Sequence, residues 1–113
     1  TVEVWDARFA KPVDIDLVER LITAGIPIVT VEDHGLIGGF GAAVIEAAAD
    51  RGLDTSHISR LGLPDHWIHQ GSRGEQLAQA GIDVTGIISA IRAAAIPRDM
   101  PVAITGTPIA QPV

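Results

Sequence analysis

The chain has 113 residues, 47% of them hydrophobic and 19% charged, which is enough for one hydrophobic core and too apolar for a disordered segment. Its formal net charge of -6 and single lysine leave no basic stripe for phosphates, so we expect no nucleic-acid partner. Cysteine is absent, which excludes disulfides and cysteine-based zinc sites. No apolar run reaches the length of a transmembrane helix, so we also expect no membrane partner.

The first third of the chain alternates strand-like and helix-like segments. β-prone residues at positions 2–5 predict a first strand, and a start inside a strand indicates a fragment of a longer chain or one subunit of an assembly. Residues 14–24 carry apolar side chains at helical spacing, and Gly25 supplies the stop signal. The β-branched run over 26–32, IPIVTVE, is typical of a central parallel strand buried on both faces.

The middle of the chain repeats this alternation. A glycine-bearing loop over 33–39 leads into an Ala-rich segment that predicts a second helix over 40–51. Residues 57–63 form a third strand candidate, and a loop over 64–71 follows it.

Two further helices are predicted after this loop. Ser72 and Glu75 match a capping box, in which each side chain satisfies a free amide of the first turn, so Ser72 is interpreted as a cap and not as a nucleophile. That helix ends at Gly81, and either Asp83 or Thr85 caps the last helix.

This order of elements predicts an α/β fold with a mostly parallel sheet of about four to five strands and helices on both faces. The predicted domain covers residues 1–96. Residues 97–113 are Pro-rich, and they are interpreted either as an irregularly packed tail or as an edge strand at 102–105.

The loop between the second predicted strand and its helix is the most unusual stretch. It contains Glu32, His34, Gly38, Gly39 and Gly41 at the carboxyl end of a strand, where open α/β sheets place ligands. One interpretation is an anion or interface loop, because helix amino termini attract anions. The favoured interpretation is a tight strand-to-helix turn whose glycines allow close packing, since the spacing is not that of a P-loop.

The loop over 64–71 is the second candidate site. His66 and His69 stand three apart, but they share a loop and not a helix face, so a surface or interdomain contact is favoured over a metal site. Trp67 is interpreted either as part of an exposed patch that contacts another domain or as a core residue. Glu32 and Asp33 are adjacent on a strand and point to opposite faces, which makes them a poor catalytic pair.

Three blocks of the sequence together resemble the carboxy-terminal domain of 1-deoxy-D-xylulose-5-phosphate synthases. The blocks are DARFAKPVD at 6–14, VTVEDH at 29–34 continued by GGFGAAV at 38–44, and LGLPDHWIHQGS at 61–72. The third is the most specific to the synthases, whereas the first two are shared more loosely by transketolases and 2-oxo-acid dehydrogenase beta subunits. Ala42, Trp67 and Gln70 depart from the usual Ser, Phe and His.

The resemblance implies a role in an enzyme that joins pyruvate, after decarboxylation, to glyceraldehyde 3-phosphate, the entry step of an isoprenoid precursor pathway. Its cofactors are thiamine diphosphate and Mg²⁺, which in this family bind to other domains. This sequence has no Gly-Asp-Gly and no Asn, both of which the family's diphosphate motif requires. We therefore expect no catalytic, cofactor-binding or metal residue in this chain, and no activity from it alone.

The partners that the resemblance implies are the remaining domains of the same enzyme and a second copy in a homodimer. The chain is then a structural, dimer-supporting domain of a cytoplasmic enzyme, or of a plastid enzyme for a plant-type source. The alternative is a docking subunit of a split transketolase or 2-oxo-acid dehydrogenase. An unrelated, free-standing ligand-binding α/β domain is the third hypothesis.

Overall fold

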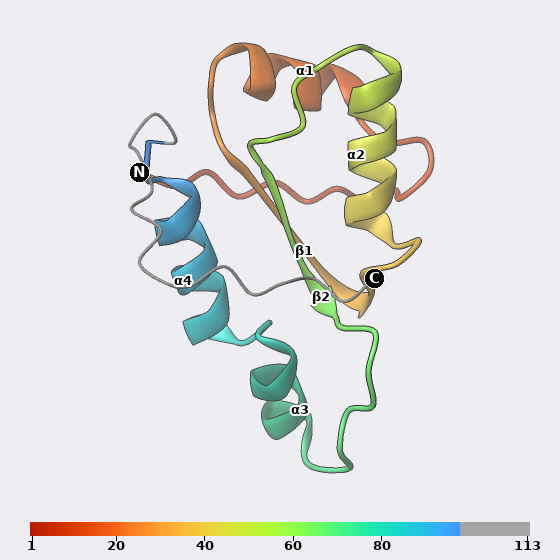
Figure 1. Ribbon diagram of the computed structural model, residues 1–113, viewed down its shortest axis with the longest axis vertical. Coiled ribbons are helices and arrows are strands. Elements are labelled where there is room, and N and C mark those ends of the chain that lie inside the picture. Colours follow the sequence, from red (N-terminus) through yellow and green to blue (C-terminus); the bar gives the residue numbers. More distant parts are fainter. Residues whose placement is uncertain (98–113) are drawn as a thin grey trace, which may run out of the picture.

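The computed structural model describes residues 1–97, which form an α/β fold with four helices around a small parallel sheet (Figure 1). The elements in chain order are α1 (Ile15–Thr23), β1 (Ile28–Gly35), α2 (Phe40–Asp50), β2 (Ile58–Leu63), α3 (Arg73–Ala80) and α4 (Val84–Ala94). β1 and β2 pair in parallel, with Ile28 opposite Ile58 and Gly35 opposite Leu63, and α2 connects them as the crossover helix. Within residues 1–97, no helix is long and apolar enough to span a membrane.

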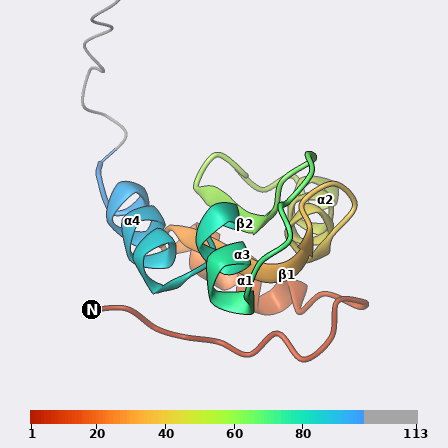
Figure 2. The same cartoon turned by 90° about the horizontal axis from the view of Figure 1, so that it is seen from below.

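The main core lies between α1, α2 and one face of the sheet. Val18, Val44, Ala48 and Ile58 are buried there, and Ala48 is completely inaccessible to solvent. The small side chains of the Ala-rich α2 allow this helix to approach the strands closely. Figure 2 shows α2 on one side of the two strands and α4 on the other, so helices lie on both faces of the sheet.

An ion-pair cluster joins the surfaces of α1 and α2. The guanidinium of Arg51, which follows α2, donates to Glu19 and contacts Asp16 at 3.4 Å, both on α1. The hydrogen bond to Glu19 is the main cause of a raised Arg51 pKa. These exposed pairs link the surfaces of the two helices and add little to stability.

The number of strands differs from the sequence-based expectation. Residues 1–97 contain two paired strands, so four to five are not confirmed, and the candidate edge strand at 102–105 lies outside the described residues. The strand expected at 2–5 is wrong, because this segment makes local contacts in place of a backbone ladder. The indole of Trp5 donates to Glu3 at 3.3 Å, and Arg20 lies over its ring.

The strand expected at 26–32 is displaced along the chain and is less buried than expected. The Ile26 amide donates to the Leu21 carbonyl at 2.9 Å, which ties this residue to the end of α1, and β1 then begins at Ile28. Burial on both faces was wrong, because Val31 is 45% exposed. The opposite face carries the buried polar side chains of Thr30 and Glu32.

The predicted helices agree with the structure. α1 is capped by Asp14, whose carboxylate accepts from the Leu17 amide at 3.0 Å. Of the two candidate caps for α4, Asp83 is the cap, and its carboxylate accepts from the Gly86 amide at 2.8 Å. α3 begins after Ser72 and ends at Gly81, which adopts the left-handed conformation.

Candidate functional site

Glu32 lies in the second half of β1, and its carboxylate reaches the amino terminus of α2. Its carboxylate accepts hydrogen bonds from the backbone amides of Phe40, at 2.6 Å, and Gly41, at 3.0 Å. The side chain is only 8% exposed. The N-cap position of α2 is Gly39, which has no side chain to serve as an acceptor. Glu32, eight residues before Phe40, supplies the acceptor in its place.

Two glycines make room for this carboxylate, and a third makes room for the neighbouring Thr30. A Cβ on Gly39 would collide with the Glu32 carboxylate and with the Gly35 carbonyl, and a Cβ on Gly62 would lie 2.9 Å from Glu32 Cγ. A Cβ on Gly41 would lie 2.6 Å from Thr30 Oγ1, a buried hydroxyl without a hydrogen-bond partner among residues 1–97. The glycines therefore allow strand, helix and loop to meet around one buried carboxylate.

The β1–α2 loop is held in a fixed shape. Gly38 has a φ of 70°, in the left-handed region that favours glycine. The Leu36 amide donates to the Leu63 carbonyl at 3.0 Å, and Arg60 Nη1 donates to the Leu36 carbonyl at 2.8 Å. The next residue, Ile37, is 74% exposed. The loop thus presents an apolar side chain on a hydrogen-bonded support.

The loop after β2 carries the second candidate surface. Trp67 is 93% exposed, so a core position among residues 1–97 is wrong, while a contact with another domain stays a prediction. Nδ1 of His66 lies 3.1 Å from the Trp67 carbonyl oxygen. The His69 amide donates to Gln79 Oε1 at 3.2 Å, and Gln76 Nε2 donates to the His69 carbonyl at the same distance. The loop is therefore fastened to α3.

The capping box of α3 is present as predicted. Ser72 Oγ accepts from the Glu75 amide at 3.3 Å, and Glu75 Oε2 accepts from the Ser72 amide at 2.8 Å. The backbone and hydroxyl hydrogen bonds from Ser72 lower the pKa of the Glu75 carboxyl. Ser72 is thus engaged as a cap, which agrees with the interpretation that it is not a nucleophile.

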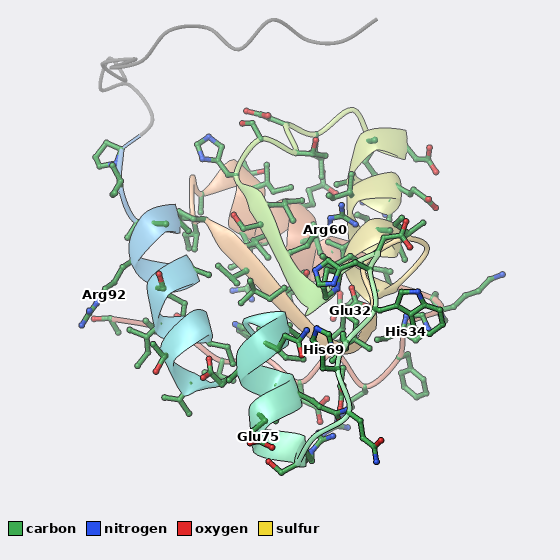
Figure 3. The ribbon with its side chains drawn as sticks, turned by 60° about the horizontal axis from the view of Figure 1, so that its bottom comes forward. Glu32, His34, Arg60, His69, Glu75 and Arg92 are labelled. Carbon is green, nitrogen blue, oxygen red and sulfur yellow. The ribbon has the colours of Figure 1, made fainter. Side chains whose placement is uncertain are left out.

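Both candidate loops leave the sheet at the same edge. Parallel strands have their carboxyl ends together, and Figure 3 shows Glu32, His34 and His69 near the end toward which the strands point. Glu32 and Asp33 do point to opposite faces, since the Asp33 side chain is 50% exposed and Glu32 is buried. Nδ1 of His34 lies 3.1 Å from the Gly35 carbonyl oxygen.

The described residues do not fit a diphosphate and Mg²⁺ site. Residues 1–97 hold no group of three His, Asp or Glu side chains placed to bind a metal ion. Two first-turn amides of α2, those of Phe40 and Gly41, already donate to Glu32. An external phosphate would have to displace that carboxylate, so the geometry favours the tight-turn interpretation of this loop.

Sequence reasoning missed three contacts at this edge, namely the capping of α2 by Glu32, the Arg60–Leu36 hydrogen bond and an ion pair between Arg73 and Asp33. Only the first had a signal in the sequence. Gly39 and Gly38 precede α2 where a Ser, Thr, Asp or Asn cap is usual, so the acceptor had to come from elsewhere. The other two depend on how loops pack and have no local signature.

Comparison with known proteins places this chain among relatives of greater length. The family described as "Transketolase, C-terminal domain" matches residues 1–87. A 1-deoxy-D-xylulose-5-phosphate synthase from Geobacillus sp. (strain WCH70) is 42% identical over 92 residues, which are 81% of this chain and 15% of the relative. The same named synthase from Anaeromyxobacter sp. (strain Fw109-5) is 46% identical over 92 residues, 80% of this chain and 14% of the relative.

A third synthase of this name, from Rhodopirellula baltica (strain DSM 10527 / NCIMB 13988 / SH1), is 38% identical over 94 residues, 83% of this chain and 15% of the relative. This chain therefore spans about one seventh of the length of the synthases that it matches. The family match covers the strand, loop and helix that surround Glu32 as well as the Trp67 loop. The chain belongs to the transketolase C-terminal domain family and is similar to this part of 1-deoxy-D-xylulose-5-phosphate synthases.

Proposed function

We propose that this chain acts as the carboxy-terminal, structural and dimer-supporting domain of a 1-deoxy-D-xylulose-5-phosphate synthase. The observation that carries the proposal is the 38–46% identity to synthases over 80–83% of this chain, within about one seventh of each relative. The full enzyme would join the two-carbon unit of pyruvate, after loss of CO₂, to glyceraldehyde 3-phosphate. Its location would be the cytoplasm.

The chemistry would belong to the remainder of such an enzyme. Thiamine diphosphate with Mg²⁺ would supply the carbanion chemistry there. The residues of this chain would support that site from outside, since Glu32 serves the packing of α2 and Ser72 serves the start of α3. The proposed partners are accordingly the other domains of the same enzyme and a second copy.

The two loops at the carboxyl edge are the proposed contact with those partners. Trp67 and Ile37 are large apolar side chains that are mostly exposed, and each sits on a loop held by hydrogen bonds. Large aromatic side chains on rigid supports are frequent anchors of protein interfaces. His66 and His69 flank Trp67 and would form the polar rim of this contact.

The first test is the activity of the purified 113-residue chain. With pyruvate, glyceraldehyde 3-phosphate, thiamine diphosphate and Mg²⁺ supplied, we expect no release of CO₂ and no sugar phosphate. Turnover above a heat-denatured control would show that the chain is an enzyme by itself and would refute the proposal.

The second test places the chain in a full-length context. Residues 1–94 replace the matching residues of the Geobacillus synthase, and the chimera is expected to retain turnover and dimeric sedimentation. Introducing Trp67→Ala is expected to weaken the dimer or lower turnover by tenfold or more. Val84→Ala, at an apolar residue on α4 that is 73% exposed, is the matched control and should change neither property.

A further inference from the structure

The segment 64–81, which we name the strap, consists of the loop after β2 followed by α3. No side chain of α3 is buried, which is also true of α4, but α4 packs on both β1 and β2, whereas α3 makes no comparable contact with either strand. The strap also holds itself together, because Gln76 and Gln79 of α3 hydrogen-bond to the backbone of His69 in the loop. It is therefore internally ordered but contributes little to the hydrophobic core.

One ion pair joins the strap to β1. Arg73 Nη2, at the start of α3, donates to Asp33 Oδ2 at 2.7 Å, and the two side chains are 73% and 50% exposed. In the part of the chain that the structure describes, this is the one side-chain hydrogen bond between strap and β1. An exposed pair of this kind shifts a folding or opening equilibrium by only about twofold to fivefold.

The apolar contact beneath the strap is incomplete. A shallow, open hollow lies between α3, the loop and the sheet, lined by Asp33, Leu63, Ile68, Arg73, Gln76 and Leu77. Ile68 and Leu77 are only partly buried, so they line this space without filling it. Gly81 closes the strap in the left-handed conformation, with no atom within 4 Å of where its Cβ would be. Apolar packing therefore holds the strap weakly.

We propose that the strap opens and closes as a unit on the folded domain, with the Asp33–Arg73 ion pair as its latch. Segments that bury few apolar side chains open at a lower free energy than the core does. Because the strap carries Trp67, the latch makes Asp33 and Arg73 positioning residues for that exposed indole. This inference concerns the chain itself and does not depend on the proposed enzyme.

The test is native-state amide hydrogen exchange on the 113-residue chain. In the unmodified protein, amides of α3 are expected to exchange faster than amides of α2 and β1. Arg73→Ala should raise the α3 exchange rates a further two- to fivefold or so, the factor that a surface ion pair is worth, and leave α2 unchanged. Arg92→Ala, at an exposed arginine on α4, is the matched control and should leave α3 exchange unchanged.

Two further measurements separate a latch from a general loss of stability. The charge-exchanged double variant Asp33→Arg with Arg73→Asp should restore slow α3 exchange, because it rebuilds the pair with opposite polarity. In the unmodified chain, about 1 M NaCl should mimic Arg73→Ala by screening the pair. The proposal is overturned if α3 and α2 share one exchange rate, if Arg73→Ala changes both alike, or if neither responds to the substitution.

Discussion

Glu32 and Ser72 each accept hydrogen bonds from the free amides at the start of a helix, but from different distances along the chain. Ser72 satisfies an amide three residues ahead of it, whereas Glu32 reaches two amides eight and nine residues ahead across a strand-to-helix turn. The first arrangement can be read from neighbouring residues, and the capping box was predicted from the sequence. The second requires β1 and α2 to be already packed together.

The first prediction concerns the removal of this carboxylate. Glu32→Ala leaves the amides of Phe40 and Gly41 without an acceptor in a mostly buried site, so we expect the free energy of unfolding to fall by about 2–4 kcal/mol. Glu46→Ala, at an exposed glutamate on the same helix, should change it by less than about 0.5 kcal/mol. Urea unfolding of both variants decides the matter, and equal losses would contradict the assigned role of Glu32.

A second prediction tests the close contact between strand and helix. Gly41→Ala places a methyl group against Thr30 and Arg60, so it should cost about 1–3 kcal/mol by overpacking. Gly74→Ala adds the same group in α3, where nothing lies within 4 Å, and should be neutral or stabilise by up to about 1 kcal/mol. In thermal unfolding, Gly41→Ala should therefore lower the melting temperature, whereas Gly74→Ala should raise it or leave it unchanged. Similar changes in melting temperature for both variants would contradict close packing at Gly41.

Sequence patterns were sufficient for most single elements. The helical spacing of apolar residues located α1, and the cap signals at Ser72 and at Asp83 or Thr85 located α3 and α4, because each signal lies within a few residues of the turn that it stabilises. The β-prone residues at 2–5 gave a wrong strand, since strand propensity becomes structure only when a partner strand is in register. No local pattern reports that partner.

α3 is the element for which capping should matter most. With no buried side chain on this helix, local terms decide whether its first turn forms. Ser72→Ala is expected to cost about 1 kcal/mol, felt as faster exchange of α3 amides with little change in the global melting temperature. Ser72→Asp keeps an acceptor and should restore slow exchange. A drop in the melting temperature without a change confined to α3 would contradict this.

The capping box should also make α3 sensitive to acid. The pKa of Glu75 is lowered because hydrogen bonds from Ser72 favour the charged carboxylate in the folded state. Its contribution is complete above the pKa of the unfolded chain and is lost as the pH falls through the lowered folded value. Exchange of α3 amides, corrected for intrinsic pH effects, should accelerate over this acid range, and Glu75→Gln should weaken that dependence. An unchanged pH profile in Glu75→Gln would exclude the carboxylate as the cause.

At the scale of the whole molecule, the core is small and lies on one side. Val18, Val44, Ala48 and Ile58 form it, while Trp67 and Ile37 remain exposed at the carboxyl edge of the sheet. The sequence predicted the α/β class because alternation of elements is a property of the whole chain. It could not predict that the buried face of β1 would carry Thr30 and Glu32, since their burial depends on α2.

The last prediction follows from this division between core and edge. Trp67→Ala should leave the melting temperature of the 113-residue chain within about 2 °C, because the indole is 93% exposed. Val44→Ala, at a side chain that is 2% exposed, should cost about 2 kcal/mol and lower it by several degrees. Differential scanning calorimetry gives both values. Unfolding by Trp67→Ala would mean that this residue supports the fold and not an interface.

The unpartnered hydroxyl of Thr30 and the missing side chain of Gly41 have an evolutionary consequence. The two positions share one small space between β1 and α2, so they are epistatic: a group gained by the helix can be accommodated by a group lost from the strand. Thr30→Ala removes an oxygen that has no partner to lose among residues 1–97, and it relieves one of the two contacts that the methyl group of Gly41→Ala makes, the other being with the side chain of Arg60. Descendants of this sequence could thus exchange volume between strand and helix, provided that both positions change together.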